Sequence, residues 1–127
     1  MSITTNYSGF GSFYFHKIIN DIIELGKLNE GKKVILDYGC GQKILSSKIR
    51  NNKVLNFDLN PKYSNFQSID NLKFNYIIIN HVFMYFSKNR ISDFLKKIKY
   101  MNPNCQFIIG IGKQNLISKI GKYITFN

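Results

Sequence analysis

A one-sided hydrophobic pattern near the start of the chain predicts a helix over residues 12–25. Apolar side chains recur there at the i, i+3 and i+4 spacing of a helix that buries one face. They are Phe15, Ile18, Ile19, Ile22 and Ile23. Gly26 and Gly31 follow and favour the end of the helix.

Four short apolar runs farther along the chain predict strands. Each is rich in β-branched or aromatic residues and is bounded by Gly, Asn or Pro, as buried strands commonly are. The runs are "KKVILDYG" at residues 32–39, "KVLNFDLNP" at 53–61, "NYIIIN" at 75–80 and "CQFIIGIG" at 105–112.

Helical patterns separate these runs and follow the last one. They lie at residues 44–50, between a cap at Ser87 or Asn89 and the stop at Asn102-Pro103, and at residues 114–123. Continuous apolar strands that alternate with helices are typical of an α/β domain, with a parallel sheet covered on both faces. We expect a single domain over residues 1–127, with 1–31 as an N-terminal helix or lid and 32–127 as the core.

The charge balance favours a polyanionic partner without specifying one. The chain has 18 Lys and Arg against 7 Asp and Glu, a formal net charge of +11. Such a charge would attract RNA, phosphorylated glycans or a membrane surface. The basic residues are mostly scattered lysines, however, and a solvated lysine-rich surface accounts for them as well.

The sequence shows no sign of membrane insertion or export. No uninterrupted run of about 18 apolar residues occurs, and the N-terminus lacks a cationic start followed by an apolar stretch. We therefore expect a soluble, cytoplasmic protein with no membrane span. Cys40 and Cys105 lie far apart, without a CxxC pair or zinc-type His spacing, so neither a disulfide nor a metal site is predicted.

The turn after the first predicted strand, in "VILDYGCGQK", is the best candidate for a ligand site. Parallel sheets bind ligands beyond the carboxyl ends of their strands, and Gly39 and Gly41 allow a positive φ and a close backbone approach. A dinucleotide fits poorly, because Ile44 replaces the third glycine of the dinucleotide motif and Asp37 would repel a pyrophosphate. Asp58 ends the next strand, where an acid can accept hydrogen bonds from ribose hydroxyls. A nucleoside with a positive charge and no phosphate, such as S-adenosylmethionine, satisfies both acids.

Three motifs in order resemble the class I S-adenosylmethionine-dependent methyltransferases. They are "VILDYGCG", "VLNFDLNP" and "FNYIIINHVFMYF", within residues 32–113. The resemblance implies a Rossmann-like three-layer sandwich in which Asp37 and the glycines line the methionine part of the cofactor, Asp58 holds the ribose, and Asp70 lies near the adenine. Asn80 would face cofactor and acceptor, and His81 and Tyr85 would border the transfer site. The full set implied for the cofactor is Asp37, Tyr38, Gly39, Cys40, Gly41, Asp58, Leu59, Asp70 and Asn80.

The chain also departs from this family. Lys43 stands where the family motif GCGxG has its last glycine, a variation similar to that in methyltransferases of surface-glycan pathways. The segment between Asp58 and Tyr76 leaves room for at most a stub of the family's third strand, at residues 66–69. Nothing after Gln114 is expected to supply the two last strands of the family fold, so we predict that they are missing.

Several of these residues have a second interpretation. Asp58 can simply initiate a turn, Asp70 can be a plain loop acid, and Cys40 can be a small residue that fits the turn. His81 is a candidate general base for a hydroxyl acceptor, or a histidine packed under the next helix. The N-terminal segment can be a lid whose Tyr7, Phe10 and Tyr14 touch the ligand, or can pack on the sheet.

The function predicted from the sequence is methyl transfer from S-adenosylmethionine to a hydroxyl or amine of a small molecule or glycan. The alternative is a non-catalytic adenosyl-binding module, or one completed by a protein partner or by self-association through a free sheet edge. RNA methylation or RNA binding rests on the net charge alone, and it predicts lysines gathered around the mouth of the pocket.

Overall fold

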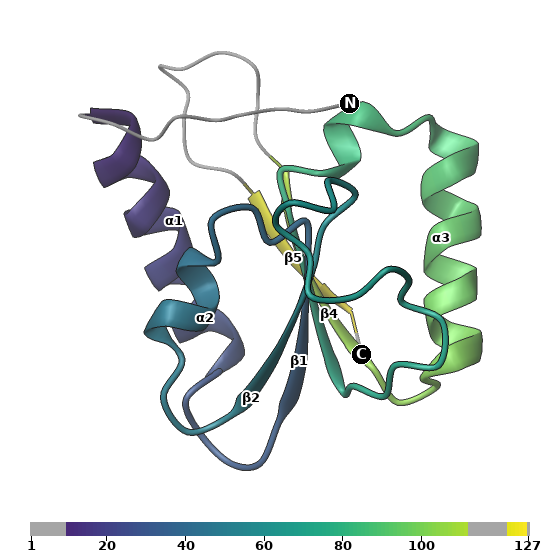
Figure 1. Cartoon of the computed structure of the whole chain (residues 1–127), viewed down its shortest axis with the longest axis horizontal. Coiled ribbons are helices and arrows are strands. Elements are labelled where there is room, and N and C mark those ends of the chain that lie inside the picture. The colour runs from purple at the N-terminus through teal and green to yellow at the C-terminus, as the bar shows by residue number, and fades with distance from the viewer. Residues whose placement is uncertain (1–9, 112–121, 127) are drawn as a thin grey trace.

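The chain folds into a sheet flanked by helices (Figure 1). The computed structural model describes residues 10–111 and 122–126. In chain order the elements are α1 (Phe10–Gly26), β1 (Val34–Tyr38), α2 (Ile44–Lys48), β2 (Lys53–Phe57), β3 (Tyr76–Asn80), the 3-10 turn η1 (Phe83–Tyr85), α3 (Lys88–Met101), β4 (Gln106–Ile111) and β5 (Lys122–Phe126).

The strands form one sheet in the order β2-β1-β3-β4-β5. The first four run parallel, so that Leu36 of β1 pairs with Leu55 on one side and with Ile77 on the other. The chain moves outward from β1 to β2 and then returns to β3 on the opposite side of β1. This reversal of strand order opens a crevice beyond the carboxyl ends of β1 and β3, where α/β sheets commonly bind ligands.

The two faces of the sheet bury separate apolar clusters. On one face Ile35, Ile78 and Ile108 pack with α1 and α2, which lie on the left of the sheet in Figure 1. On the other face Leu36 and Ile77 belong to a cluster that includes residues of α3, on the right. Because both faces are covered, successive strand residues are apolar on both sides, which explains the continuous apolar runs in the sequence. The predicted α/β sandwich is confirmed at this level.

One prediction about the C-terminal part is wrong. Lys122–Phe126 forms β5, which pairs antiparallel with β4 and places Phe126 opposite Phe107. A reversed strand therefore does follow residue 114, where we expected none, and residues 122 and 123 belong to a strand instead of a helix. The rest of that expected helix, residues 114–121, lies outside the described residues. The run "KYITF" is β-branched and aromatic, and it pairs the open backbone edge of β4.

The connection between β2 and β3 is irregular, and residues 66–69 form no strand. This connection is held by side-chain hydrogen bonds and a few backbone hydrogen bonds, instead of by the regular hydrogen bonds between strands. Asn102, at the end of α3, accepts a hydrogen bond from Phe74 N–H and donates one to the carbonyl of Leu72, each at 3.2 Å. The amide of Asn65 donates to the carbonyl of Asn56 at the edge of β2. In place of the expected strand stub there is a loop that is hydrogen-bonded to the edge of β2 and to the end of α3.

The start of α3 matters for the site because it points toward the same crevice. The Ser87 hydroxyl accepts a hydrogen bond from Arg90 N–H at 3.2 Å, which caps the helix as one of the two predicted caps would. The helix ends at Met101, before Asn102. Within the described ranges no helix has the length and apolar character needed to cross a membrane.

Candidate functional site

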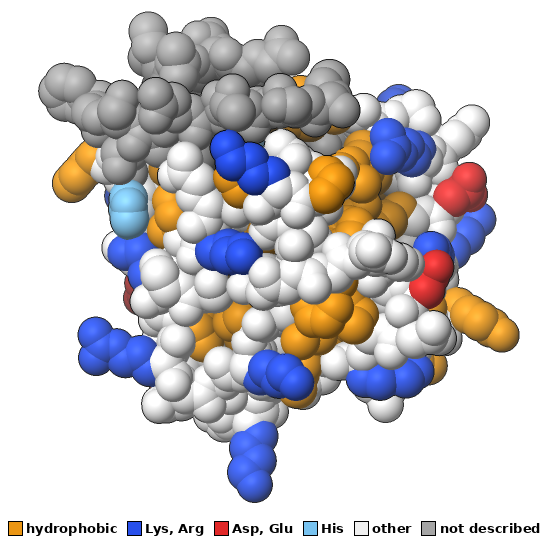
Figure 2. Space-filling model, viewed as in Figure 1, with side chains coloured by type: hydrophobic (Ala, Val, Ile, Leu, Met, Phe, Trp, Pro, Cys, Tyr) orange, Lys and Arg blue, Asp and Glu red, His pale blue; other side chains and the backbone are white. Residues whose placement is uncertain are grey.

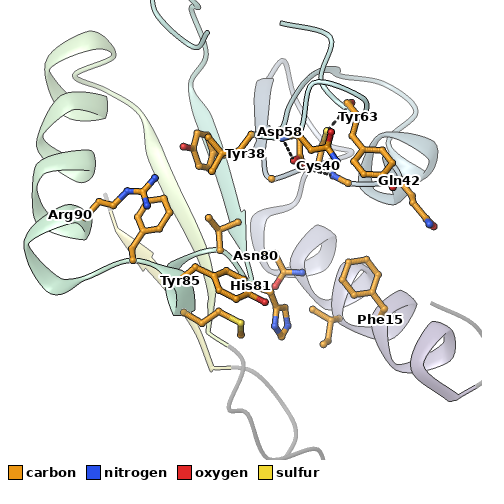
Figure 3. A pocket seen from close by; sticks show the side chains of 18 of the residues that line it. Phe15, Tyr38, Cys40, Gln42, Asp58, Tyr63, Asn80, His81, Tyr85 and Arg90 are labelled. Carbon is orange, nitrogen blue, oxygen red and sulfur yellow. Dashed lines mark hydrogen bonds between the residues drawn. The ribbon is translucent and has the colours of Figure 1, made fainter. Parts of the chain in front are cut away.

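A pocket of about 630 Å³ lies beyond the carboxyl ends of β1, β2 and β3. Its walls come from α1, the turn after β1, the loop after β2, the segment after β3 and the first turn of α3 (Figure 3). The volume falls in the range of about 300–1,000 Å³ that small-molecule sites usually have. The position is the crevice at the reversal of strand order, where ligands are expected.

The structure brings most of the predicted site residues into this pocket. Only Asp37 and Asp70 of the predicted set do not line it. Those that do are Tyr38, Gly39, Cys40, Gly41, Asp58, Leu59, Asn80, His81 and Tyr85. Tyr14, from the predicted lid, also lines the pocket, whereas Tyr7 and the side chain of Phe10 lie outside the described part of the chain.

Asp58 joins the ends of β1 and β2. Its Oδ2 accepts a hydrogen bond from Gly41 N–H at 2.9 Å, and its Oδ1 accepts one from Asn60 N–H at 2.8 Å. The turn is fixed further because Gly39 and Cys40 N–H both donate to the carbonyl of Phe57. The turn-forming interpretation of Asp58 is therefore real, yet each carboxylate oxygen keeps a second lone pair for a ligand in the pocket.

The two glycines of the turn serve different purposes. Both have a positive φ, +86° at Gly39 and +49° at Gly41. A Cβ added to Gly39 would lie 2.5 Å from Cγ2 of Val82, whereas one added to Gly41 would meet none of the described residues within 4 Å. Gly39 lets the turn pack against the segment after β3, and Gly41 leaves open space on the pocket side.

Asp37 lies behind the turn, on the face of the sheet covered by α1. Its side chain is 6% exposed, and burial, with a smaller contribution from the charge of Asp58, raises the pKa of its carboxyl to about 7. Asn56 is its register neighbour on β2, and the buried Asn56 Oδ1 has no hydrogen-bond partner among the described residues. A protonated Asp37 would place an O–H donor on the strand beside an acceptor that lacks one.

Asn80 ends β3 with an unsatisfied side chain. Both Oδ1 and Nδ2 are buried and have no hydrogen-bond partner in the described part of the chain. The carboxamide lies across Gly110 of β4, where an added Cβ would come 2.1 Å from Asn80 Oδ1. Because an unpaired buried amide is costly, a pocket-lining residue of this kind is a candidate for contact with a ligand.

His81 follows in a conformation that few side chains adopt. Its φ is +59°, and its N–H donates to the carbonyl of Gly110 at 3.0 Å. Left-handed backbone costs a residue other than glycine about 1–2 kcal/mol, and such strain tends to persist at functional sites. Burial lowers the pKa of the imidazole, so the ring is neutral at pH 7 and able to accept a proton. Tyr85, in η1, borders the same pocket and is exposed.

Asp70 is not brought together with the other predicted residues. Its Oδ1 lies 2.8 Å from Lys97 Nζ of α3, and hydrogen bonds from Lys97 and Ser68 lower the pKa of its exposed carboxyl. The structure places it as a surface loop acid, the second of its two interpretations.

Sequence reasoning missed Arg90, which lines the pocket from the first turn of α3 (Figure 3). Its guanidinium carbon lies 3.7 Å from the centroid of the Phe86 ring. The helical pattern marks residue 90 only as a polar position. The available signal was compositional, because Arg50 and Arg90 are the only arginines among the 18 basic residues of the sequence.

No described lysine lines the pocket. On the face shown in Figure 2 the basic side chains are separated by polar and apolar surface. Lys43, at the position of the last glycine in the motif GCGxG, adopts a left-handed φ of +63°, and its Nζ donates to Asn65 Oδ1 at 2.8 Å. The lysine distribution gives no support to a nucleic-acid site at the pocket.

The cysteines have local roles. Both are free and buried, and burial raises the pKa of each thiol to about 12. The Cys40 thiol donates to the carbonyl of Tyr63 at 3.4 Å, so it fills space in the turn as a neutral group. Among the described residues no group of three or more His, Cys, Asp or Glu could hold a metal ion.

The pocket therefore combines distinct chemical groups within one cavity. Asp58 offers an anion, His81 a neutral base, Asn80 an unpaired amide and Arg90 a cation. Comparison with protein-family models, with curated proteins and with solved structures found no match for this chain.

Proposed function

We propose that the chain binds S-adenosylmethionine in this pocket and transfers its methyl group to a hydroxyl or amine of a small molecule or glycan. The observation that carries the proposal is the contact between Asp58 and the glycine turn. It holds an acid with spare acceptor capacity beside open space at Gly41, at the reversal of strand order. The proposal refines the α/β sandwich to a Rossmann-like arrangement of the methyltransferase type.

The residues present fit an adenosyl cofactor. Asp58 would accept hydrogen bonds from the ribose hydroxyls, because each of its oxygens accepts only one backbone N–H and keeps a second lone pair. The turn at Gly39 and Gly41 would approach the methionine part, and the buried Asp37 behind it would favour a ligand that carries an ammonium or sulfonium charge. When bound, the cofactor supplies an electrophilic methyl group. Asp70 has no place in this assignment.

The protein would contribute mainly position and a proton acceptor. Displacement at a methyl group depends on alignment of the two reactants, which a shaped pocket supplies. The neutral imidazole of His81 would take the proton of a hydroxyl or amine acceptor, and the unpaired carboxamide of Asn80 would fix the acceptor group beside it. The strained backbone at His81 holds the ring at the pocket wall.

A second function, an adenosyl-binding module completed by another chain, is favoured by the edge of the sheet. Within the described residues β2 has a strand partner on one side only, and its outer edge accepts a backbone hydrogen bond from Asn65 at Asn56. A strand edge without a partner strand is a ready template for pairing with another chain. This version predicts adenosyl binding without turnover by the isolated chain.

Calorimetric titration of the purified chain with S-adenosylhomocysteine tests the proposal. We expect micromolar binding, which corresponds to about −8 kcal/mol, and no binding of NAD as the comparison ligand. Asp58→Ala should weaken the affinity at least about tenfold through loss of charge-assisted hydrogen bonds. Asp70→Ala is the matched control, because it removes an acid outside the pocket, and it should change the affinity less than about twofold.

Failure of S-adenosylhomocysteine and S-adenosylmethionine to bind the folded wild-type chain would overturn the proposal. Equal affinities for the wild-type and Asp58→Ala proteins would overturn the ribose assignment alone. Circular dichroism and the unfolding midpoint of each variant separate lost binding from lost structure.

A further inference from the structure

Arg90 is held in place at the pocket wall. The Ser87 cap fixes the first turn of α3, and the Arg90 guanidinium carbon lies 3.7 Å from the Phe86 ring centroid. This distance is well inside the range of about 6 Å for a cation–π contact. In Figure 3 the arginine lies on the α3 side of the pocket, away from Phe15 and Gln42. A stacked guanidinium is preorganised, so less entropy is lost when it binds a ligand.

The charge of Arg90 is not neutralised by a carboxylate in the described part of the chain. The ion pairs found there are Lys17 with Asp21 and Lys97 with Asp70. The positive charge does reach the pocket interior. Burial raises the pKa of Tyr38, the nearby Arg90 charge counters part of that rise, and the charge of Asp58 adds a smaller rise. An anion that entered the pocket would therefore meet a cation with its hydrogen-bond donors available.

The residue type adds information that the net charge does not. The chain uses lysine almost throughout, yet the cation of the pocket wall is one of its two arginines. Arginine presents planar donors that match the two oxygens of a carboxylate or phosphate, whereas lysine is a mobile point charge. Because this is one cation and no described lysine joins it, the wall suits a single small anion and not a polyanion.

The segment just before Arg90 offers aromatic surface. Tyr85 lines the pocket and remains exposed, and Phe86 carries the guanidinium. Aromatic side chains of this kind favour a planar, apolar ligand body. The acid Asp58 belongs instead to the opposite, glycine-turn side of the pocket.

We propose that the acceptor is an aromatic anion whose carboxylate or phosphate group pairs with Arg90 while its ring packs against Tyr85 and Phe86. The role of this molecule as methyl acceptor rests on the proposed function, but the anion site itself does not. Arg90 is thus a substrate-binding residue that orients the acceptor hydroxyl or amine toward Asn80 and His81.

Binding of small probe pairs to the full chain tests this site by ligand-observed and protein-observed NMR titration. The probes are 4-hydroxybenzoate against the neutral 4-hydroxybenzamide, and phenyl phosphate against phenol. We expect at least one anion to bind about tenfold or more tighter than its neutral partner, which also identifies the anionic group. Arg90→Gln should abolish the preference, and Arg90→Lys should restore only part of it.

Arg50→Gln is the matched control, because it removes the other arginine, whose side chain borders a separate surface hollow. It should leave the preference within about twofold. Equal binding of anions and neutral partners, absence of binding by all four probes, or equal losses in Arg50→Gln and Arg90→Gln would each overturn the inference.

S-adenosylhomocysteine is titrated in parallel. Its binding without an anion preference contradicts this inference alone, and an anion preference without its binding contradicts the proposed function alone.

Discussion

At the residue scale, the buried carboxyl of Asp37 lowers the stability of the free protein when it ionises. The folded protein raises the pKa of this carboxyl from 3.8 to about 7, chiefly through burial. The folded state therefore holds a proton that the unfolded state has already released at pH 5–6. Stability from this group is complete below about pH 4 and is lost as the pH rises through 7. A cationic ligand would favour the ionised form and reverse the penalty.

Asp37→Asn should accordingly stabilise the free protein above neutral pH. The difference in unfolding free energy between the variant and the wild type should grow by roughly 2–3 kcal/mol from pH 5 to pH 8. Urea unfolding at several pH values measures it, and the affinity for S-adenosylhomocysteine should fall in the same variant. The opposite pH effect of His81, whose lowered pKa reduces stability as the pH falls below about 6.5, cancels in the difference.

Asp70→Asn is the control for this measurement. The pKa of Asp70 is lowered, so stability from this residue is present above about pH 4 and lost only at more acidic pH. Its difference from the wild type should stay constant between pH 5 and 8. Parallel stability curves for the wild type and Asp37→Asn would show that Asp37 ionises normally in the folded protein.

At the scale of elements, the two glycines in the turn between β1 and α2 are expected to have different roles. We expect one to matter for packing and the other for ligand binding. Gly39 has no room for a side chain because Val82 packs against it, whereas Gly41 faces open space. Both need a left-handed backbone. A methyl group at the first position should therefore disturb packing, and one at the second should mainly occupy ligand space.

Gly39→Ala should destabilise the protein by roughly 2 kcal/mol or more, from backbone strain together with the contact with Val82. Gly41→Ala should cost only about 1 kcal/mol of strain yet weaken S-adenosylhomocysteine binding about tenfold or more. Urea unfolding and calorimetry on the same preparations separate the two effects. If Gly39→Ala lost more affinity than Gly41→Ala while both variants were equally stable, these separate roles of the two glycines would be contradicted.

The elements also show what the sequence could predict. Helix periodicity and continuous apolar runs gave α1, α3 and the four parallel strands, because these signals are local. The strand β5 was not predicted because it forms by pairing with β4. A five-residue pattern does not indicate such a tertiary contact. Of the two acids predicted at strand ends, Asp58 lines the pocket as expected, whereas Asp37 is buried behind the turn. The positions of Asp70 and Arg90 are set by the packing of a loop and of the start of α3. The spacing of residues in the sequence could not predict these positions.

The whole molecule carries more positive charge than its ion pairs can balance. The formal net charge is +11, and the described residues contain two ion pairs, both on the surface. The basic side chains on the face shown in Figure 2 are spread apart, and repulsion among like charges destabilises the compact state. We therefore expect the net charge to act mainly on stability, whereas the proposed anion site depends on Arg90.

Salt should therefore stabilise the folded chain. The Debye length falls from about 30 Å at 0.01 M to about 8 Å at 0.15 M, which screens repulsion between separated surface lysines. We expect the thermal unfolding midpoint to rise by several degrees between 10 and 200 mM NaCl and then to level off, because at 1 M the Debye length is already about 3 Å. Addition of sucrose at constant low salt controls for general solute effects, since it strengthens burial without screening charge. A midpoint that stays constant or falls over this range would mean that attractive pairs dominate, so that the surface charges are organised and not scattered.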